Sequence, residues 1–159
     1  MRKPEREITD PAELQYVLEK AQICRIGMVD DGEPYVVPMN FGLGENCLYL
    51  HSSQKGRKAE AMRRNPLVCF EMEVDVALVE AELPCKWTAH FRSIIGTGTA
   101  VFLEDRQEKL DGLAAIMAHY SDRYAGPEPG FNESVVDITA VIRIDIRSMT
   151  GKKHGFNAS

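Results

Sequence analysis

Three short runs of β-branched and aromatic residues follow one another near the N-terminus, and they constrain the fold more than any other feature. The runs cover residues 23–29, 35–41 and 47–51, and polar segments of a few residues that contain glycine separate them. Apolar runs joined by such turns are typical of strands that pair with their neighbours in sequence. The pattern therefore predicts an antiparallel meander.

The rest of the chain adds strands and a few helices. The predicted helices cover residues 11–21, 54–64 and 105–117, and the further strands cover residues 67–74, 87–103 and 138–146. The first and third helices each follow an aspartate and carry a glutamate three residues later, which is a capping pattern. Gly96 and Gly98 predict a bulge or barrel corner in the long strand. Strands that follow one another through turns favour an antiparallel sheet closed into a barrel.

Composition and charge restrict the function. The 159 residues, 44% of them hydrophobic, predict one domain over residues 1–159. A net charge of −5 disfavours nucleic-acid binding, and the charged N-terminus with no long apolar run predicts a cytoplasmic protein without a membrane span. The four cysteines lack metal-site spacing, so we expect buried free thiols. The acidic stretch 71–82 predicts a solvated strand end and an exposed loop without chemistry.

Basic residues gather where the third predicted strand runs into a helix. In residues 52–64, five cations stand against Glu60 alone, after two serines and with Gly56 among them. Unpaired N–H groups at a helix start, serine hydroxyls and a forked guanidinium are the groups that hold phosphate. The pattern predicts a phosphate site at this junction. A solvated basic helix face would show the same composition, so both interpretations stay open.

The other motifs say less about function. The glycine pairs at 42 and 44 and at 96 and 98 lack the context of a dinucleotide fingerprint, and the four histidines have no metal-site spacing, so no metal is expected. His51 lies beside the predicted phosphate site and is either functional or an ordinary rim histidine. Lys152 and Lys153 form a basic tail that contacts phosphate, a partner subunit or only solvent. No residue is identified as catalytic.

Several segments together resemble the FMN-binding split-barrel superfamily, the pyridoxamine 5'-phosphate oxidase-like proteins, and above all its Nim-type nitroimidazole-resistance branch. The matching pieces are Tyr35-Val36-Val37-Pro38-Met39-Asn40-Phe41-Gly42, Leu48-Tyr49-Leu50-His51-Ser52 with Gly56-Arg57-Lys58-Ala59, and Phe91-Arg92-Ser93-Ile94-Ile95-Gly96-Thr97-Gly98-Thr99-Ala100. The resemblance implies a mainly β fold with α-helices, a split barrel. It would be an antiparallel Greek-key barrel of about six strands with flanking helices.

The resemblance also implies roles for individual residues. Ser52, Arg57 and Lys58 would hold the FMN phosphate, which agrees with the interpretation from the residues themselves. The strand around Pro38, Met39 and Asn40 would run along the flavin ring. The further cofactor-binding candidates are Ser93, which would reach the cofactor from the long strand, His51, which favours the Nim-like branch, and Lys152. The cofactor of this superfamily lies at a dimer interface, so a homodimer is expected.

The function that follows is an FMN-dependent oxidoreductase. NADH or NADPH would reduce the flavin, and a small acceptor such as a nitroaromatic would take the electrons. One alternative is a non-catalytic flavin- or heme-binding module, for which His51 or His90 would be the axial ligand. Pyridoxamine phosphate oxidation is a further alternative, which Asn40 and His51 disfavour.

Overall fold

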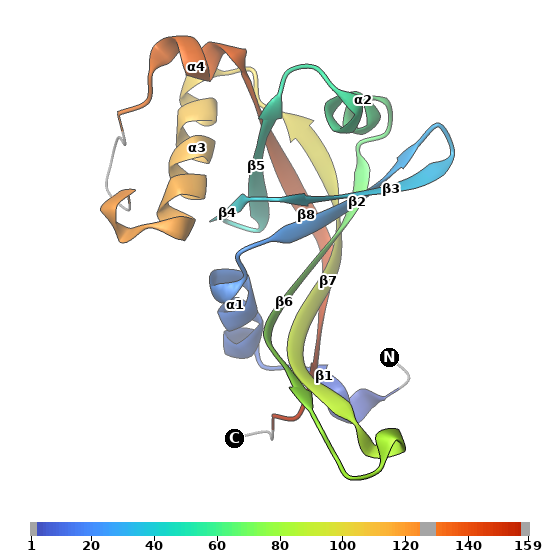
Figure 1. Cartoon of the computed structure of the whole chain (residues 1–159). Coiled ribbons are helices and arrows are strands. Elements are labelled where there is room, and N and C mark those ends of the chain that lie inside the picture. The colour runs from blue at the N-terminus through green and yellow to red at the C-terminus, as the bar shows by residue number, and fades with distance from the viewer. Residues whose placement is uncertain (1–2, 125–129, 157–159) are drawn as a thin grey trace.

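The computed structural model describes residues 3–124 and 130–156 of the chain (Figure 1). The elements, in chain order, are η1 (Pro4–Arg6), β1 (Glu7–Ile8), α1 (Pro11–Lys20), β2 (Cys24–Asp30), β3 (Glu33–Met39), β4 (Phe41–Gly44), β5 (Cys47–Ser53), α2 (Arg57–Arg64), β6 (Leu67–Val79), η2 (Pro84–Lys86), β7 (Thr88–Phe102), α3 (Arg106–Tyr120), η3 (Asp122–Tyr124), α4 (Glu133–Ile138) and β8 (Thr139–His154). Every strand pairing is antiparallel. The predicted antiparallel pairing of successive strands is confirmed, but the predicted strand over residues 35–41 is divided at Asn40 into β3, which pairs with β2, and β4, which pairs with β5.

The sheet closes on itself through one stretch of chain. Its strand order is β3-β2-β6-β7-β8-β5-β4, so β3 and β4 lie at opposite ends of the order. Only Asn40 separates these two strands in sequence, β3 pairs with β2, and β4 pairs with β5. Residues 33–44 therefore belong to both edges of the sheet. This shared segment closes the sheet into a barrel. The predicted mainly β split barrel is confirmed, with β1 as a short addition beside β8.

The barrel interior is filled by apolar side chains from all the long strands. Its fully buried large residues include Ile26, Phe41, Leu50, Phe70 and Ile142. These residues alternate with outward-facing ones along their strands, as the period of two in a strand requires. The pairing of the long strand β7 with β8 shifts register between Thr97 and Gly98, since Thr97 pairs with Ser148 and Gly98 pairs with Ile146. A bulge is therefore confirmed at the predicted glycines, but its extra residue, Arg147, belongs to β8.

The helix caps follow the predicted pattern. A side-chain oxygen of Asp10 accepts from the Ala12 N–H at 2.9 Å at the start of α1, and Asp105 accepts from the Glu108 N–H at 3.0 Å at the start of α3. Both helices lie on the same side of the barrel (Figure 1). Helix α2 begins at Arg57 instead of at the predicted residue 54, because Gly56 has φ +124°, which is outside the helical region.

Three predictions about the later elements and the cysteines were wrong, and helix α4 was not predicted. Strand β6 continues to Val79 and, with β7, forms a hairpin that extends past the barrel (Figure 1), so the acidic stretch is mostly strand and not loop. The last strand runs on to His154, so there is no basic tail. Residues 133–138 form α4, because Asn132 caps them. Cys69 and Cys85 are exposed, since one lies on the outer face of β6 and the other in η2, whereas Cys24 and Cys47 are buried as expected.

Candidate functional site

The junction between β5 and α2 has the backbone features of an anion site. Gly56 occupies the N-cap position of α2 with a positive φ, and no side chain caps the first turn of the helix. The first N–H groups of a helix have no partner within the helix, and they carry the positive end of its dipole. An anion placed at this turn would be stabilised by both.

Ser52, four residues before Gly56 in the chain, supplies an unusual polar atom. It is the second-last residue of β5, and only 7% of its surface is exposed. Within residues 3–124 and 130–156, its Oγ is the one buried side-chain oxygen or nitrogen without a hydrogen-bond partner. A buried hydroxyl without a partner costs free energy, and natural proteins seldom retain one. A ligand oxygen at this point would satisfy it.

Arg57 begins α2 and is held from two sides. Its Nε donates to Oδ2 of Asp30 at 2.6 Å, and its guanidinium lies over the Tyr35 ring, 4.2 Å from the centroid. Arg64, at the other end of α2, donates to Oδ1 of the same Asp30 carboxylate. The Arg57 hydrogen bond, with the charge of Arg64 beside it, holds the pKa of the Asp30 carboxyl below its usual range. A cation therefore stands at the junction in a fixed orientation.

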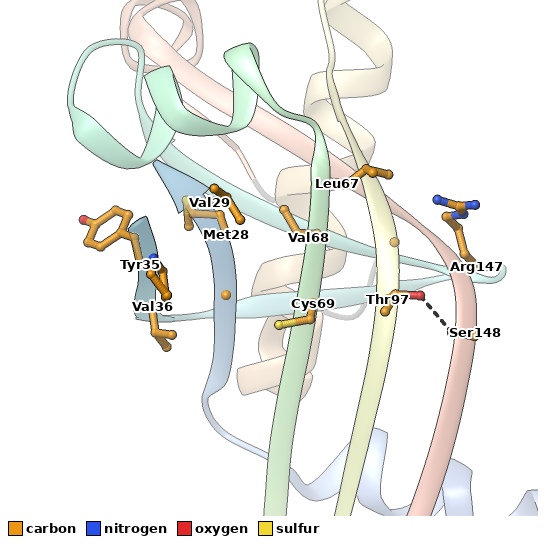
Figure 2. Close-up of a pocket in the computed structure, with 13 residues that line it drawn as sticks. Met28, Val29, Tyr35, Val36, Leu67, Val68, Cys69, Thr97, Arg147 and Ser148 are labelled. Atoms are coloured by element: carbon orange, nitrogen blue, oxygen red, sulfur yellow. Dashed lines mark hydrogen bonds between the residues drawn. The ribbon is translucent and has the colours of Figure 1, made fainter. Parts of the chain in front are cut away.

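An apolar groove starts at Tyr35 and crosses the outer face of the barrel (Figure 2). Its volume is about 690 Å³. The lining residues come from β2, β3, β6, β7 and β8, and Figure 2 shows Tyr35 and Val36 at one side, Arg147 and Ser148 at the other, and Cys69 between them. A planar ring system fits a groove of this size and polarity. Because Tyr35 lies against Arg57 and also lines the groove, the candidate anion site adjoins the groove.

The three residues predicted to follow a flavin ring differ in accessibility. Pro38 faces outward on β3, as Val36 does, and Asn40 is exposed between β3 and β4. Met39 is buried in the core, so it offers only its backbone groups to a ligand. The prediction for Pro38 and Asn40 stays open, because neither lines the groove described above.

His51 and Lys58 are neighbours near the junction. His51 precedes Ser52 on β5 and points to the opposite face of the strand, as alternation requires. Desolvation, and after it the charge of Lys58, lowers the pKa of His51 below its ordinary value. A lowered pKa favours the neutral imidazole, and the side chain lies on the face of β5 opposite the Ser52 hydroxyl.

Ser93 and Lys152 lie far from the junction. They pair with each other across β7 and β8, and the Ser93 hydroxyl donates to the Lys152 carbonyl at 3.5 Å. Cys69 on β6 pairs with both β2 and β7, so it serves as a common reference level across the sheet. From that level, Ser93 lies four residues along β7 in one direction, and Asp30 lies three residues along β2 in the opposite direction. Seven positions at about 3.3 Å per residue are roughly 23 Å. One chain alone does not bring Ser93 and Lys152 to Arg57.

Glu13, Arg92 and Lys153 form a buried ion network near Lys152, which the sequence did not predict. Glu13 accepts from Arg92 at 2.8 Å and from Lys153 at 2.6 Å, and all three side chains are at most 20% exposed. Burial acts to raise the pKa of Glu13, but the hydrogen bonds from Lys153 and Arg92 outweigh it, so this pKa is lowered. The sequence indicated only a capping role for Glu13, because its partners lie 79 and 140 residues away.

The other histidine considered as a heme ligand lies on β7. His90 packs against the rings of His154 and Phe156, with centroids 6.3 and 5.8 Å apart, and is not among the residues that line the groove. Across the described ranges, no three His, Cys, Asp or Glu side chains are grouped to hold a metal. The helices in the same ranges are too short or too polar to cross a membrane.

An antiparallel barrel closed by a shared strand, with a candidate anion site at its rim and a groove beside it, defines the class of split barrels. The family profile described as pyridoxamine 5'-phosphate oxidase matches residues 10–153. The chain belongs to this family, and the resemblance noted in the sequence is confirmed. No curated protein matches the chain in sequence.

Three solved structures show the relationship in space. A proposed 5-nitroimidazole antibiotic resistance protein of Bacteroides thetaiotaomicron is 33% identical, with a TM-score of 0.80 over 92% of this chain and 86% of that one. A FAD-binding protein of Mesorhizobium loti is 25% identical, with a TM-score of 0.66 over 94% and 98%. A FAD- and heme-binding protein of Mycobacterium smegmatis is 17% identical, with a TM-score of 0.85 over 98% and 76%, and this likeness shows the fold alone.

Proposed function

We propose that the chain is a flavoprotein that binds FMN, with the phosphate at the β5–α2 junction and the ring system in the adjacent groove. The observation that carries this proposal is the buried Ser52 hydroxyl without a partner, beside an uncapped helix start and the fixed cation Arg57. A phosphate monoester would supply the partner that the Ser52 hydroxyl and the helix start lack, and its charge would complement that of Arg57. Lys58 adds a second positive charge in the same turn.

The relatives support a flavin over other phosphorylated ligands. The Mesorhizobium loti protein is described as FAD-binding, and the family is named for pyridoxamine 5'-phosphate oxidase. FMN carries one phosphate, whereas FAD carries two. The junction has the features of a site for a single phosphate, so we propose FMN as the ligand. Heme is less well supported, because neither His51 nor His90 lines the groove.

We also propose a homodimer formed through the outer face that holds the groove. This face exposes the apolar side chains Val29, Val36, Leu67 and Ile95, each at least 46% accessible. Exposed apolar surface of this kind is typical of an interaction site. A two-fold axis across the face would bring the Ser93 and Lys152 end of one subunit towards the Arg57 end of its partner. Such a dimer would reconcile the two separated groups of predicted cofactor-binding residues.

The activity we propose is electron transfer from NADH or NADPH to a small acceptor such as a nitroaromatic. Bound FMN would supply the redox chemistry. The chain itself would hold the phosphate through Ser52, Arg57 and Lys58, and the groove would exclude water from the ring. We assign no proton-transfer role to any side chain.

The proposal is tested with purified protein titrated with FMN, FAD, riboflavin and heme. We expect a flavin spectrum, tighter binding of FMN than of riboflavin, and loss of the flavin absorption on anaerobic addition of NADH or NADPH. Binding of FMN without reduction by either nucleotide would indicate a binding module, and a Soret band would indicate heme. Oxidation of pyridoxamine phosphate by the loaded protein would indicate the third alternative.

Arg57→Ala provides the direct test of the phosphate site. Loss of a charge-assisted hydrogen bond should raise the Kd for FMN roughly 5- to 150-fold. Arg63→Ala is the matched control, because Arg63 carries the same charge on the same helix but donates to the Gln54 carbonyl and lies over Phe102. Equal affinities of wild type and Arg57→Ala for FMN would remove this junction from the site.

A further inference from the structure

Asp30 occupies a position that its sequence context, a polar turn between two strands, does not explain. It is the last residue of β2, and its side chain is 9% exposed although both of its cationic partners are more than half exposed. Those partners, Arg57 and Arg64, are the first and last residues of α2, and seven residues place them on one face of the helix. One buried carboxylate therefore fastens both ends of α2 to the barrel.

The way Asp30 binds Arg57 determines which part of the guanidinium is available. The carboxylate takes the Nε–H, and Tyr35 lies against the flat face of the group. In the described part of the chain, the two Nη groups of Arg57 have no hydrogen-bond partner, and the side chain is 59% exposed. The two Nη groups form a fork that matches two oxygens of a phosphate. The guanidinium is thus held by its Nε edge and one face, with the fork directed outward.

We propose that Asp30 is the positioning residue for the phosphate site: it orients Arg57 so that the Nη fork meets the ligand phosphate. This proposal rests on the proposed flavin-binding function. An arginine without such restraints loses side-chain conformational freedom when it binds a ligand, and this loss weakens binding. Asp30 and Tyr35 impose that restriction before the ligand arrives.

Simple electrostatics predicts the opposite effect of removing Asp30. A carboxylate near a phosphate repels it, so a neutral residue at position 30 should tighten FMN binding if charge alone mattered. Both carboxylate oxygens are, however, already engaged by arginines. Without the carboxylate, the two guanidinium groups repel each other and Arg57 is released from its orientation. The sign of the change therefore distinguishes positioning from charge.

The experiment compares FMN with riboflavin, which lacks the phosphate, in Asp30→Asn. We expect the Kd for FMN to rise about tenfold and the Kd for riboflavin to change less than twofold, so that the preference for FMN falls about tenfold. In the Arg57→Lys background, the same substitution should leave FMN binding unchanged or tighten it, since lysine has no fork to orient. Unchanged or tighter FMN binding by Asp30→Asn in the natural background would overturn the proposal.

Arg64→Gln is the matched control for the docking of α2. It removes the other partner of Asp30 but leaves the bond between Asp30 and Arg57. We expect this variant to keep its preference for FMN within about threefold of wild type. Equal losses in Arg64→Gln and Asp30→Asn would show that Asp30 only attaches the helix, and this would also overturn the proposal.

A ligand-free measurement covers the case in which Asp30→Asn does not fold. In ¹⁵N-labelled wild-type protein, the Arg57 Nε–H should give a resolved signal with slow exchange, and Arg64→Gln should retain it. Absence of this signal would refute the positioning role without any flavin present. Failure of the proposed function has a different signature, which is equal affinity of the wild type for FMN and riboflavin.

Discussion

Replacement of Ser52 by alanine should change stability and ligand affinity in opposite directions. Its Oγ is buried and has no partner within the described ranges, so Ser52→Ala removes a hydroxyl that is desolvated without compensation. Measurements on other proteins place that cost at about 1–3 kcal/mol, and a buried water would reduce it. We therefore expect the ligand-free protein to gain about 1 kcal/mol in the free energy of unfolding, or roughly 2–4 °C in Tm for a chain of this length.

The same substitution should weaken FMN binding. A hydrogen bond from a hydroxyl to a charged phosphate oxygen contributes about 1.5–3 kcal/mol, which corresponds to a roughly 10- to 150-fold rise in Kd. Added FMN should therefore raise the Tm of the wild type more than that of Ser52→Ala, because ligand stabilisation depends on the ratio of ligand concentration to Kd.

Thermal melts with and without FMN measure both effects in one series. Ser53→Ala is the control, because Ser53 is the exposed next residue and its hydroxyl accepts from the Lys55 N–H at 3.3 Å. A Ser52→Ala variant that melts below wild type without ligand and binds FMN normally would show that the hydroxyl is neither unsatisfied nor part of the site.

Three further predictions concern the fold and the groove. Glu13→Gln should lower the free energy of unfolding at pH 7 by about 1–3 kcal/mol in urea titrations, since two buried cations lose their shared anion. Because the pKa of Glu13 is lower in the folded state, this stabilisation is complete above its unfolded pKa and should disappear as the pH falls through the folded value. Gly42→Ala should cost about 1–3 kcal/mol, because a Cβ there would lie 2.7 Å from a backbone carbonyl oxygen of α3, whereas a Cβ at Gly130 meets no atom of the described residues within 4 Å, so Gly130→Ala should stay within about 0.5 kcal/mol. FMN should protect the groove residue Cys69 from iodoacetamide and leave the exposed Cys85 reactive; mass spectrometry showing equal labelling of both would contradict the placement of the ring.

Local sequence patterns determined the starts of α1 and α3 and the antiparallel pairing of successive strands. Asp10 and Asp105 cap their helices through N–H groups two or three residues away, so the information lies within one turn of chain. The phosphate-site prediction at Ser52 and Arg57 also came from adjacent residues, since the strand end and the helix start are consecutive. Residues that are close in sequence are also close in space in such features, so the sequence alone predicts them.

Only the tertiary structure decided which distant groups meet. Asp30 and Arg57 are 27 residues apart, and Glu13 and Lys153 are 140 apart, so no periodicity links either pair. The same holds for the extension of β8, where Lys152 looked like part of a solvated tail until its pairing with Ser93 placed it in the barrel wall. Barrel closure sets these contacts, because it fixes the register of every strand against two neighbours, and register depends on the whole sheet instead of on any one segment.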